Sequence, residues 1–179
     1  MSCTELTTRV FAADPTHSRF GFDLRSLGGS IYPARFEQGD VTLDLTGTTS
    51  TLAGWATVES ISIHTPDDFR NHVLGPDSFD AERHPDIAFR TISAELRDAG
   101  GTTVEGELTV RGVTTAVTAS GIGVEPSIGP MADQRTALTL QTTVNRRDFA
   151  SATWRHERHR APVRMAATLL PHVVRGAGA

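Results

Sequence analysis

The residues of this chain that could perform acid–base chemistry are histidines with acids near them. His64, Asp68 and His72 lie close together in the sequence, and imidazole gains and loses a proton near neutral pH. If the chain is an enzyme, we expect these three residues and Trp154 to be its catalytic groups. The alternative is that they are polar surface residues around a short helix, where Asp67 and Asp68 favour the helix N-terminus through charge–dipole attraction.

Nucleophilic, metal and phosphate chemistry have weaker signals. The chain has no G-x-S-x-G motif, no HExxH motif, no glycine-rich phosphate loop and only one cysteine. His156 and His159 would share a face only on a helix, so we predict no metal site and no cofactor. Arg155, Arg158 and Arg160 belong to the same stretch. They are either a solvated basic loop or a site for an anionic headgroup, because guanidinium groups match carboxylates and phosphates.

Composition excludes several classes of protein. The net charge is −4 and the pI is about 5.9, whereas a nucleic-acid partner favours a basic stripe. No stretch approaches the ~20 apolar residues of a membrane helix, so we predict no membrane insertion. The first residues show no apolar signal region, and the single Cys3 cannot form an internal disulfide. We therefore expect a cytoplasmic protein.

Short stretches in which every second residue is apolar recur along the whole chain. Alternation of this kind is typical of a strand packed on one side. Turn residues separate the stretches, and the Asp-Ala-Gly-Gly sequence at 98–101 predicts a hairpin. Many short strands at this spacing indicate a sandwich or a barrel. The alternating stretches are 20–24, 41–45, 61–65, 104–110, 113–119, 138–144 and 163–169, and turn signals include 27–30, 46–48 and 126–130.

Helix is scarce in the predicted structure. Residues 66–74 are the best candidate, because Pro66 and the acids after it suit a first turn and Gly75 suits a stop. The chain shows no internal repeat and no linker. We predict one domain over residues 1–179, with an ordered core over about residues 10–172.

Five segments of the sequence, taken in order, resemble the bacterial YceI-like family of polyisoprenoid-binding, lipocalin-like proteins. The strongest is SFDAERHPDIAFR at 78–90, followed by GELTVRGVT at 106–114. The others are DPTHS with Phe20-Gly-Phe22 at 14–22, IHT with RNHVL at 63–74, and VNRRDF at 144–149. Each segment alone is a weak signal, but their shared order and spacing cover most of the chain.

The resemblance implies an all-β fold, an antiparallel eight-stranded lipocalin-like barrel with a short helix over one side. Its interior would hold a long apolar ligand of the isoprenoid, quinone or fatty-acyl type, and the protein would carry or sequester that small apolar molecule. Residues 77–86 would close part of the wall, and Phe89 would point inward. Because edge strands can pair, a homodimer is possible.

The alternative function is an enzyme that uses the barrel cavity as a reaction chamber. A shaped apolar pocket can fold a flexible substrate and remove part of its entropy barrier. The plausible form is a cyclase or isomerase in the biosynthesis of a hydrophobic natural product. Replacing His64, His72 or Trp154 by alanine would then abolish turnover.

The ligand-binding face is predicted from the inward positions of the strands and helix. Small residues at inward positions, Gly54, Ala56, Thr142 and Ala167, favour a void, although small barrels often fill themselves with side chains. Burial of a ligand would yield about 0.8 kcal/mol per CH₂ group. The predicted contacts are Phe20, Phe22, Leu24, Val58, Ile63, Phe69, Val73, Phe79, Phe89, Leu138, Leu140 and Met165.

Overall fold

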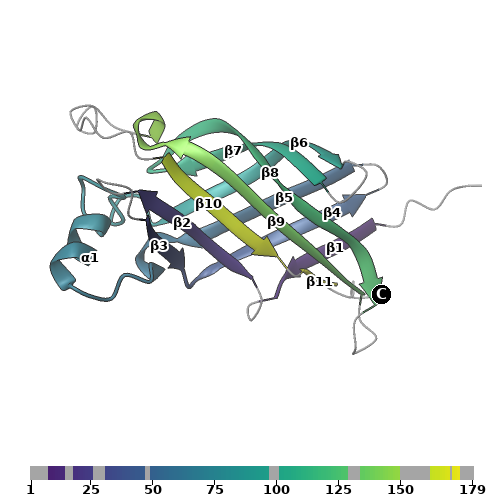
Figure 1. Cartoon of the computed structure of the whole chain (residues 1–179), viewed down its shortest axis with the longest axis horizontal. Coiled ribbons are helices and arrows are strands. Elements are labelled where there is room, and N and C mark those ends of the chain that lie inside the picture. The colour runs from purple at the N-terminus through teal and green to yellow at the C-terminus, as the bar shows by residue number, and fades with distance from the viewer. Residues whose placement is uncertain are drawn as a thin grey trace, which may run out of the picture.

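One antiparallel sheet and one α-helix make up the computed structural model (Figure 1). It describes residues 8–14, 18–25, 31–46, 49–96, 101–128, 134–149, 162–169 and 171–173. The strands are β1 Thr8–Ala13, β2 Arg19–Arg25, β3 Ile31–Phe36, β4 Gly39–Thr46, β5 Thr49–Thr57, β6 Asp86–Leu96, β7 Gly101–Val110, β8 Val113–Ile128, β9 Gln134–Asn145, β10 Pro162–Leu169 and β11 Pro171–Val173. The helix α1 spans Asp67–Leu74, and 3₁₀ helices span Val58–Ser60 and Arg146–Phe149.

The eleven strands form a closed ring of eight, because three strands are interrupted without reversing direction. β1 and β2 together pair with β4 and β3 on one side, and with β11 and β10 on the other. β9 pairs with β10 and then with β11 in an unchanged register, from Leu169↔Leu138 to His172↔Arg135. β5 to β9 complete the ring as neighbouring antiparallel strands. The predicted antiparallel lipocalin-like barrel is therefore confirmed, with eleven strand segments where eight strands were predicted.

The first two interruptions are marked by hydrogen bonds outside the ladders. Between β1 and β2 the Ser18 N–H donates to the Asp14 carbonyl at 2.8 Å. Between β3 and β4 the Glu37 N–H donates to the Ser60 carbonyl at 3.0 Å. Next to this bond, Phe36 at the end of β3 pairs with Ile61, in the segment after the first 3₁₀ helix. Pro171 begins β11 after the third interruption.

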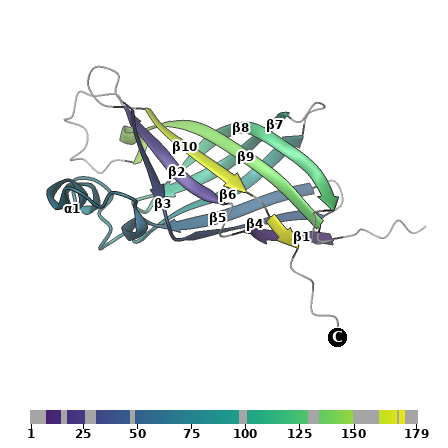
Figure 2. The same ribbon diagram turned by 60° about the horizontal axis from the view of Figure 1, so that its bottom comes forward.

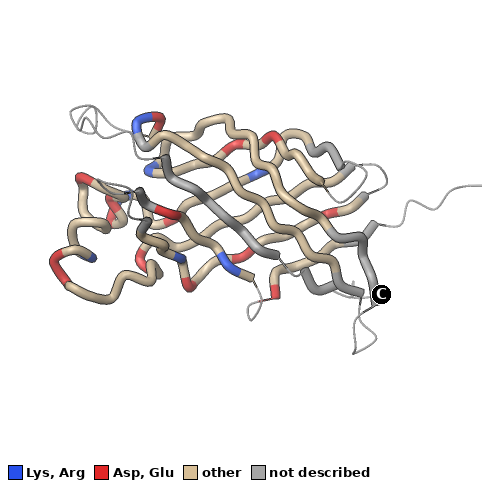
Figure 3. Tube along the Cα trace, in the orientation of Figure 1, with Lys and Arg blue, Asp and Glu red and all other residues tan. Residues whose placement is uncertain are grey.

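Alternation along the strands sends the apolar residues into the barrel, as the sequence predicts. On β7 the side of the strand that carries Val104, Leu108 and Val110 is buried, while Glu105 is exposed. The charged residues are sparse along the strands and gather in the segment around α1 (Figure 3). The interior is therefore apolar because of the two-residue period and not because of any single motif.

The two ends of the barrel are built differently. Figures 1 and 2 both place α1 at one end, and β1 and β11 toward the other. We call these the helix end and the far end. The connection between β5 and β6, residues 58–85, contains α1 and covers the helix end. Its second half turns sharply and folds back on the end of α1. The N–H groups of Phe79, Asp80 and Ala81 donate to the carbonyls of Val73, Gly75 and Leu74, respectively.

One strand prediction and one turn prediction from the sequence are wrong. Residues 61–65, expected as a strand, contain only an isolated bridge between Ile61 and Phe36. Arg111 and Gly112 have φ angles of 54° and 69°. They form the two-residue turn of the β7–β8 hairpin, the geometry that favours glycine. Pro126, expected in a turn, lies inside β8, where the register with β9 shifts between Val124 and Ser127. A bulge accommodates the missing N–H of proline inside a strand.

Close approach of β8 and β9 generates the first prediction. A Cβ added at Gly121 would lie 1.7 Å from the Thr139 carbonyl oxygen, so even alanine must separate the strands. We expect Gly121→Ala to lower the free energy of unfolding by about 2 kcal/mol or more. The matched control is Ser120→Ala, whose exposed side chain is next in the same strand; it should change stability by less than about 0.5 kcal/mol. Urea denaturation measures both, and equal stabilities would contradict this packing.

Candidate ligand cavity

An apolar cavity of about 110 Å³ lies inside the barrel. Its walls come from β2 to β9, so it crosses the interior of the ring. Three lining residues have polar groups on their side chains: Trp55, Gln141 and Thr142, and the Thr142 hydroxyl donates to the Thr118 carbonyl at 2.8 Å. The lining residues are Phe20, Gly21, Phe36, Val41, Leu52, Gly54, Trp55, Ala56, Ile87, Ala88, Phe89, Leu108, Ala119, Leu140, Gln141 and Thr142.

The cavity lies where two packed clusters meet. The helix-end cluster contains Phe22, Ala34, Phe36, Ala56, Val58, Ile61, Ile63, Val73, Ala81, Ile87, Leu108, Val110, Val117, Val144 and Phe149. The far-end cluster contains Phe11, Val41, Leu43, Leu52, Val104, Ala119, Leu138 and Leu140. Phe20 and Phe89 pack against both clusters and line the cavity between them. The void is therefore the gap left between two separately packed halves of the interior.

The rings of Phe20 and Phe89 each pack against a glycine of a neighbouring strand. A Cβ at Gly106 would lie 2.6 Å from the outer carbons of the Phe89 ring, and one at Gly39 would lie 3.1 Å from the Phe20 ring. Each ring therefore lies against a strand that has no side chain at that point. Because the rings are seated against the wall, space remains between them.

The predicted ligand-binding residues fall into three groups in the structure. Phe20, Phe89 and Leu140 line the cavity, together with the predicted small residues Gly54, Ala56 and Thr142. Phe22, Val58, Ile63 and Val73 are buried in the helix-end cluster, Phe69 and Phe79 pack against it, and Leu138 lies in the far-end cluster. The side chains of Leu24, Met165 and Ala167 are outside the described part of the structure.

The described candidate catalytic residues, His64, Asp68 and His72, lie on the exposed surface and not at the cavity. The His64 ring is 3.4 Å from the Glu37 carboxylate, on the exposed surface. Asp68 and His72 are exposed on α1, and none of the three lines the cavity. Trp154, Arg155, Arg158 and Arg160 lie outside the described residues, as do His156 and His159. Within the described part of the chain, no group of three His, Cys, Asp or Glu residues could hold a metal ion.

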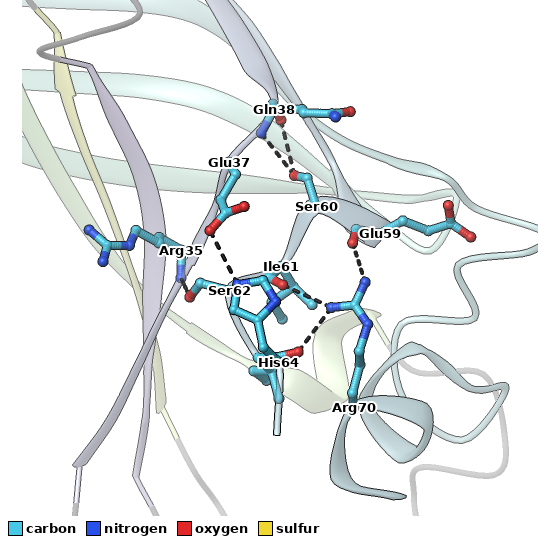
Figure 4. A network of polar contacts seen from close by, with 10 residues as sticks. Arg35, Glu37, Gln38, Glu59, Ser60, Ile61, Ser62, His64 and Arg70 are labelled. Atoms are coloured by element: carbon cyan, nitrogen blue, oxygen red, sulfur yellow. Dashed lines mark hydrogen bonds and ion pairs between the residues drawn. The ribbon is translucent and has the colours of Figure 1, made fainter. Parts of the chain in front are cut away.

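Arg70 of α1 performs a structural role beside His64 (Figure 4). Its guanidinium donates to the carbonyls of Ile61 and Ile63 at 2.9 and 3.0 Å, and to that of Glu59 at 2.6 Å. The planar fork of arginine can reach several carbonyls at once, which lysine cannot do. Arg70 thus ties α1 to the segment that enters it.

Asp80 and Arg111 are functional candidates that sequence reasoning missed. Asp80 follows Phe79 in the connection over the helix end, and Arg111 is in the β7–β8 turn. Their charged atoms are 3.9 Å apart, with side-chain exposures of 9% and 7%. Arg111 also donates to the Ser78 carbonyl at 2.6 Å. The Arg-Gly pair of the turn was visible in the sequence, but nothing there indicated its partner 31 residues earlier.

A closed antiparallel barrel with an apolar cavity in its middle defines a lipocalin-like protein. Comparison with known proteins gives the family. The model of the YceI-like domain matches residues 11–169, so the chain belongs to the YceI-like family.

Relatives and solved structures agree with this assignment. A UPF0312 protein of Staphylococcus aureus is 30% identical over 145 residues, which are 78% of this chain and 80% of that protein. The crystal structure of Burkholderia cenocepacia BcnA matches with a TM-score of 0.75 and 15% identity, over 88% of this chain and 98% of that one. A polyisoprenoid-binding domain from Saccharophagus degradans matches with a TM-score of 0.66 and 12% identity, over 95% and 100%.

The remaining expectations concern membrane insertion, cellular location and binding partners. None of the helices in the described residues is long and apolar enough to span a bilayer. The cytoplasmic location, the homodimer and the lack of a nucleic-acid partner stay predictions from the sequence.

The Arg70 contacts generate the second prediction. Hydrogen bonds to charged groups contribute about 1.5–3 kcal/mol each, and here the guanidinium is partly exposed. We expect Arg70→Ala to lower the free energy of unfolding by at least about 2 kcal/mol. Arg35→Ala is the control, since that side chain is exposed beside the same network and should change stability by less than about 0.5 kcal/mol. Similar effects of the two substitutions, measured by thermal unfolding, would contradict the role of Arg70.

Proposed function

We propose that the protein binds an apolar chain molecule in the barrel cavity and acts as a carrier or sequestering protein. The supporting observation is the cavity itself, whose walls come from β2 to β9 and consist mostly of aliphatic and aromatic carbon. Within the described part of the chain, no lining side chain titrates near neutral pH. This lining offers burial and shape to a ligand, and it does not favour acid–base chemistry.

The size of the cavity limits what fits without movement. A dry protein cavity of about 150 Å³ is enough to bind benzene. The cavity here, about 110 Å³, therefore accommodates roughly one five-carbon unit of an apolar chain. A longer ligand extends beyond this volume.

Burial alone gives such a ligand useful affinity. Each CH₂ group removed from water contributes about 0.8 kcal/mol, which is about a fourfold change in the dissociation constant. A prenyl or acyl chain therefore binds more tightly with each added carbon while the barrel can take it in.

We further propose that the ligand is of the isoprenoid type. The solved domain from Saccharophagus degradans that shares this fold is described as polyisoprenoid-binding. The lining also includes the small residues Gly54, Ala56 and Ala119, which supports a chain with methyl branches. Quinones and fatty-acyl chains are the alternatives that a binding series should include.

The third prediction concerns a substitution, Ala119→Ile, that fills the cavity. Ala119 is buried on β8 and lines the cavity, whereas Ala116 on the same strand is exposed. We expect Ala119→Ile to weaken the binding of geraniol at least tenfold, because the new side chain occupies the ligand's space. Its unfolding free energy should change by no more than about 1 kcal/mol, since added volume fills a void.

Ala116→Ile is the matched control and should bind geraniol as the wild type does. Titration calorimetry at several temperatures measures affinity, and it should show the negative heat-capacity change of apolar burial. Wild-type protein that binds no prenyl alcohol, quinone or fatty acid would disprove the proposed function. Equal loss of binding in both variants would place the ligand elsewhere.

A further inference from the structure

We propose that Phe79 sets the length of the apolar chain that the barrel accepts, and that Arg111 is the positioning residue that holds it. This inference rests on the proposed function. The chain enters the cavity and extends toward the helix end, where Phe79 stops it.

Three aromatic rings close the cavity toward the helix end. Phe36 lines the cavity. Its ring centroid is 5.5 Å from that of Phe22 and 6.1 Å from that of Phe79, and the latter two are 5.6 Å apart. Neither Phe22 nor Phe79 lines the cavity, so both stand behind Phe36. A chain that extends from the cavity toward the helix end meets this group of rings.

Phe79 is the one of the three that is not part of the barrel wall. Phe22 and Phe36 belong to β2 and β3, and their exposures are 2% and 5%. Phe79 is only partly buried, and its N–H donates to the Val73 carbonyl of α1 at 3.0 Å. It can therefore move with the connection that covers the helix end, while the wall strands keep their hydrogen bonds.

Arg111 links this connection to the β7–β8 turn. Its guanidinium donates to the Ser78 carbonyl at 2.6 Å and pairs with Asp80 at 3.9 Å, on either side of Phe79 in the sequence. Asp80 itself has a φ of 52°, a conformation that costs free energy unless surrounding contacts impose it. The contacts of Arg111 supply that constraint and so orient the Phe79 ring.

In the part of the far end that the structure describes, strand pairing holds the aromatic residue in place. Phe11 there is completely buried, and its strand β1 pairs with β4 on one side and β11 on the other. Moving it would break two ladders, whereas moving Phe79 breaks none. The helix end is therefore the direction in which a chain can lengthen.

The fourth prediction uses prenyl alcohols of 5, 10, 15 and 20 carbons as probes. For the wild type we expect affinity to rise with length and then to stop rising at the length that meets Phe79. Phe79→Leu and Phe79→Ala should move that limit to a longer alcohol and tighten its binding at least tenfold. Phe79→Trp should move the limit to a shorter one. Titration calorimetry measures each profile.

Leu138→Ala is the matched control, because it also removes a buried side chain but in the far-end cluster. It should leave the length limit where it is in the wild type. Phe79→Leu and Phe79→Trp keep a large apolar side chain, so the length profile can be measured even if Phe79→Ala does not fold.

Arg111→Ala tests the positioning role. It should shift the limit in the same direction as Phe79→Leu, a change that simple loss of stability would not produce. Arg83→Ala is its control, because Arg83 also pairs with Asp80 but is 78% exposed; its profile should match that of the wild type.

The outcomes separate this inference from the proposed function. Wild-type binding with a limit that the Phe79 variants leave unchanged would overturn only the inference. A shift in Leu138→Ala alone would assign the limit to the far end and also overturn it. Protein that binds none of the alcohols would remove both proposals.

Discussion

Closure of the sheet is the constraint on which the rest of this structure depends. An open sheet would leave a row of unpaired N–H and carbonyl groups at each edge and would expose the apolar face. Here the ladder from β9 passes to β10 and then, in the same register, to β11, which also pairs with β1. Once the ring is closed, every inward position faces another wall. The apolar residues of all the strands must then share one narrow interior.

That interior is not filled uniformly, and the reason is the seating of two aromatic rings. Phe20 lies against Gly39 and Phe89 against Gly106, so each ring occupies space that a side chain on the neighbouring strand would otherwise fill. The residues on both sides pack as separate clusters, and the cavity is the space between them. Unfilled apolar volume costs a protein stability. A bound apolar molecule would restore the missing contacts, which is why we interpret this void as a binding site.

The buried arginine interactions of the molecule stabilise the segment that covers the helix end, and they do not line the cavity. Arg70 ties α1 to the preceding segment through three carbonyls, and Arg111 ties the following segment to the β7–β8 turn. His64 and His72, which suggested catalysis from their residue type, lie on the exposed surface of the same region. The barrel thus has an apolar interior, and the connection over its helix end is polar. This arrangement fits the proposed binding of an apolar ligand.

The sequence by itself determined the all-β fold class, the short helix, the family and the strands with clear alternation, such as β2, β4, β7 and β9. Alternation and turn residues are local properties, and the family segments follow the chain. It also placed Gly54 and Ala56 at inward positions. Only the tertiary structure decided whether the inward residues leave a cavity, since a void depends on how side chains from opposite walls meet. The pairing of Asp80 with Arg111 was equally hidden, because it joins two turns that are brought together only when the barrel closes.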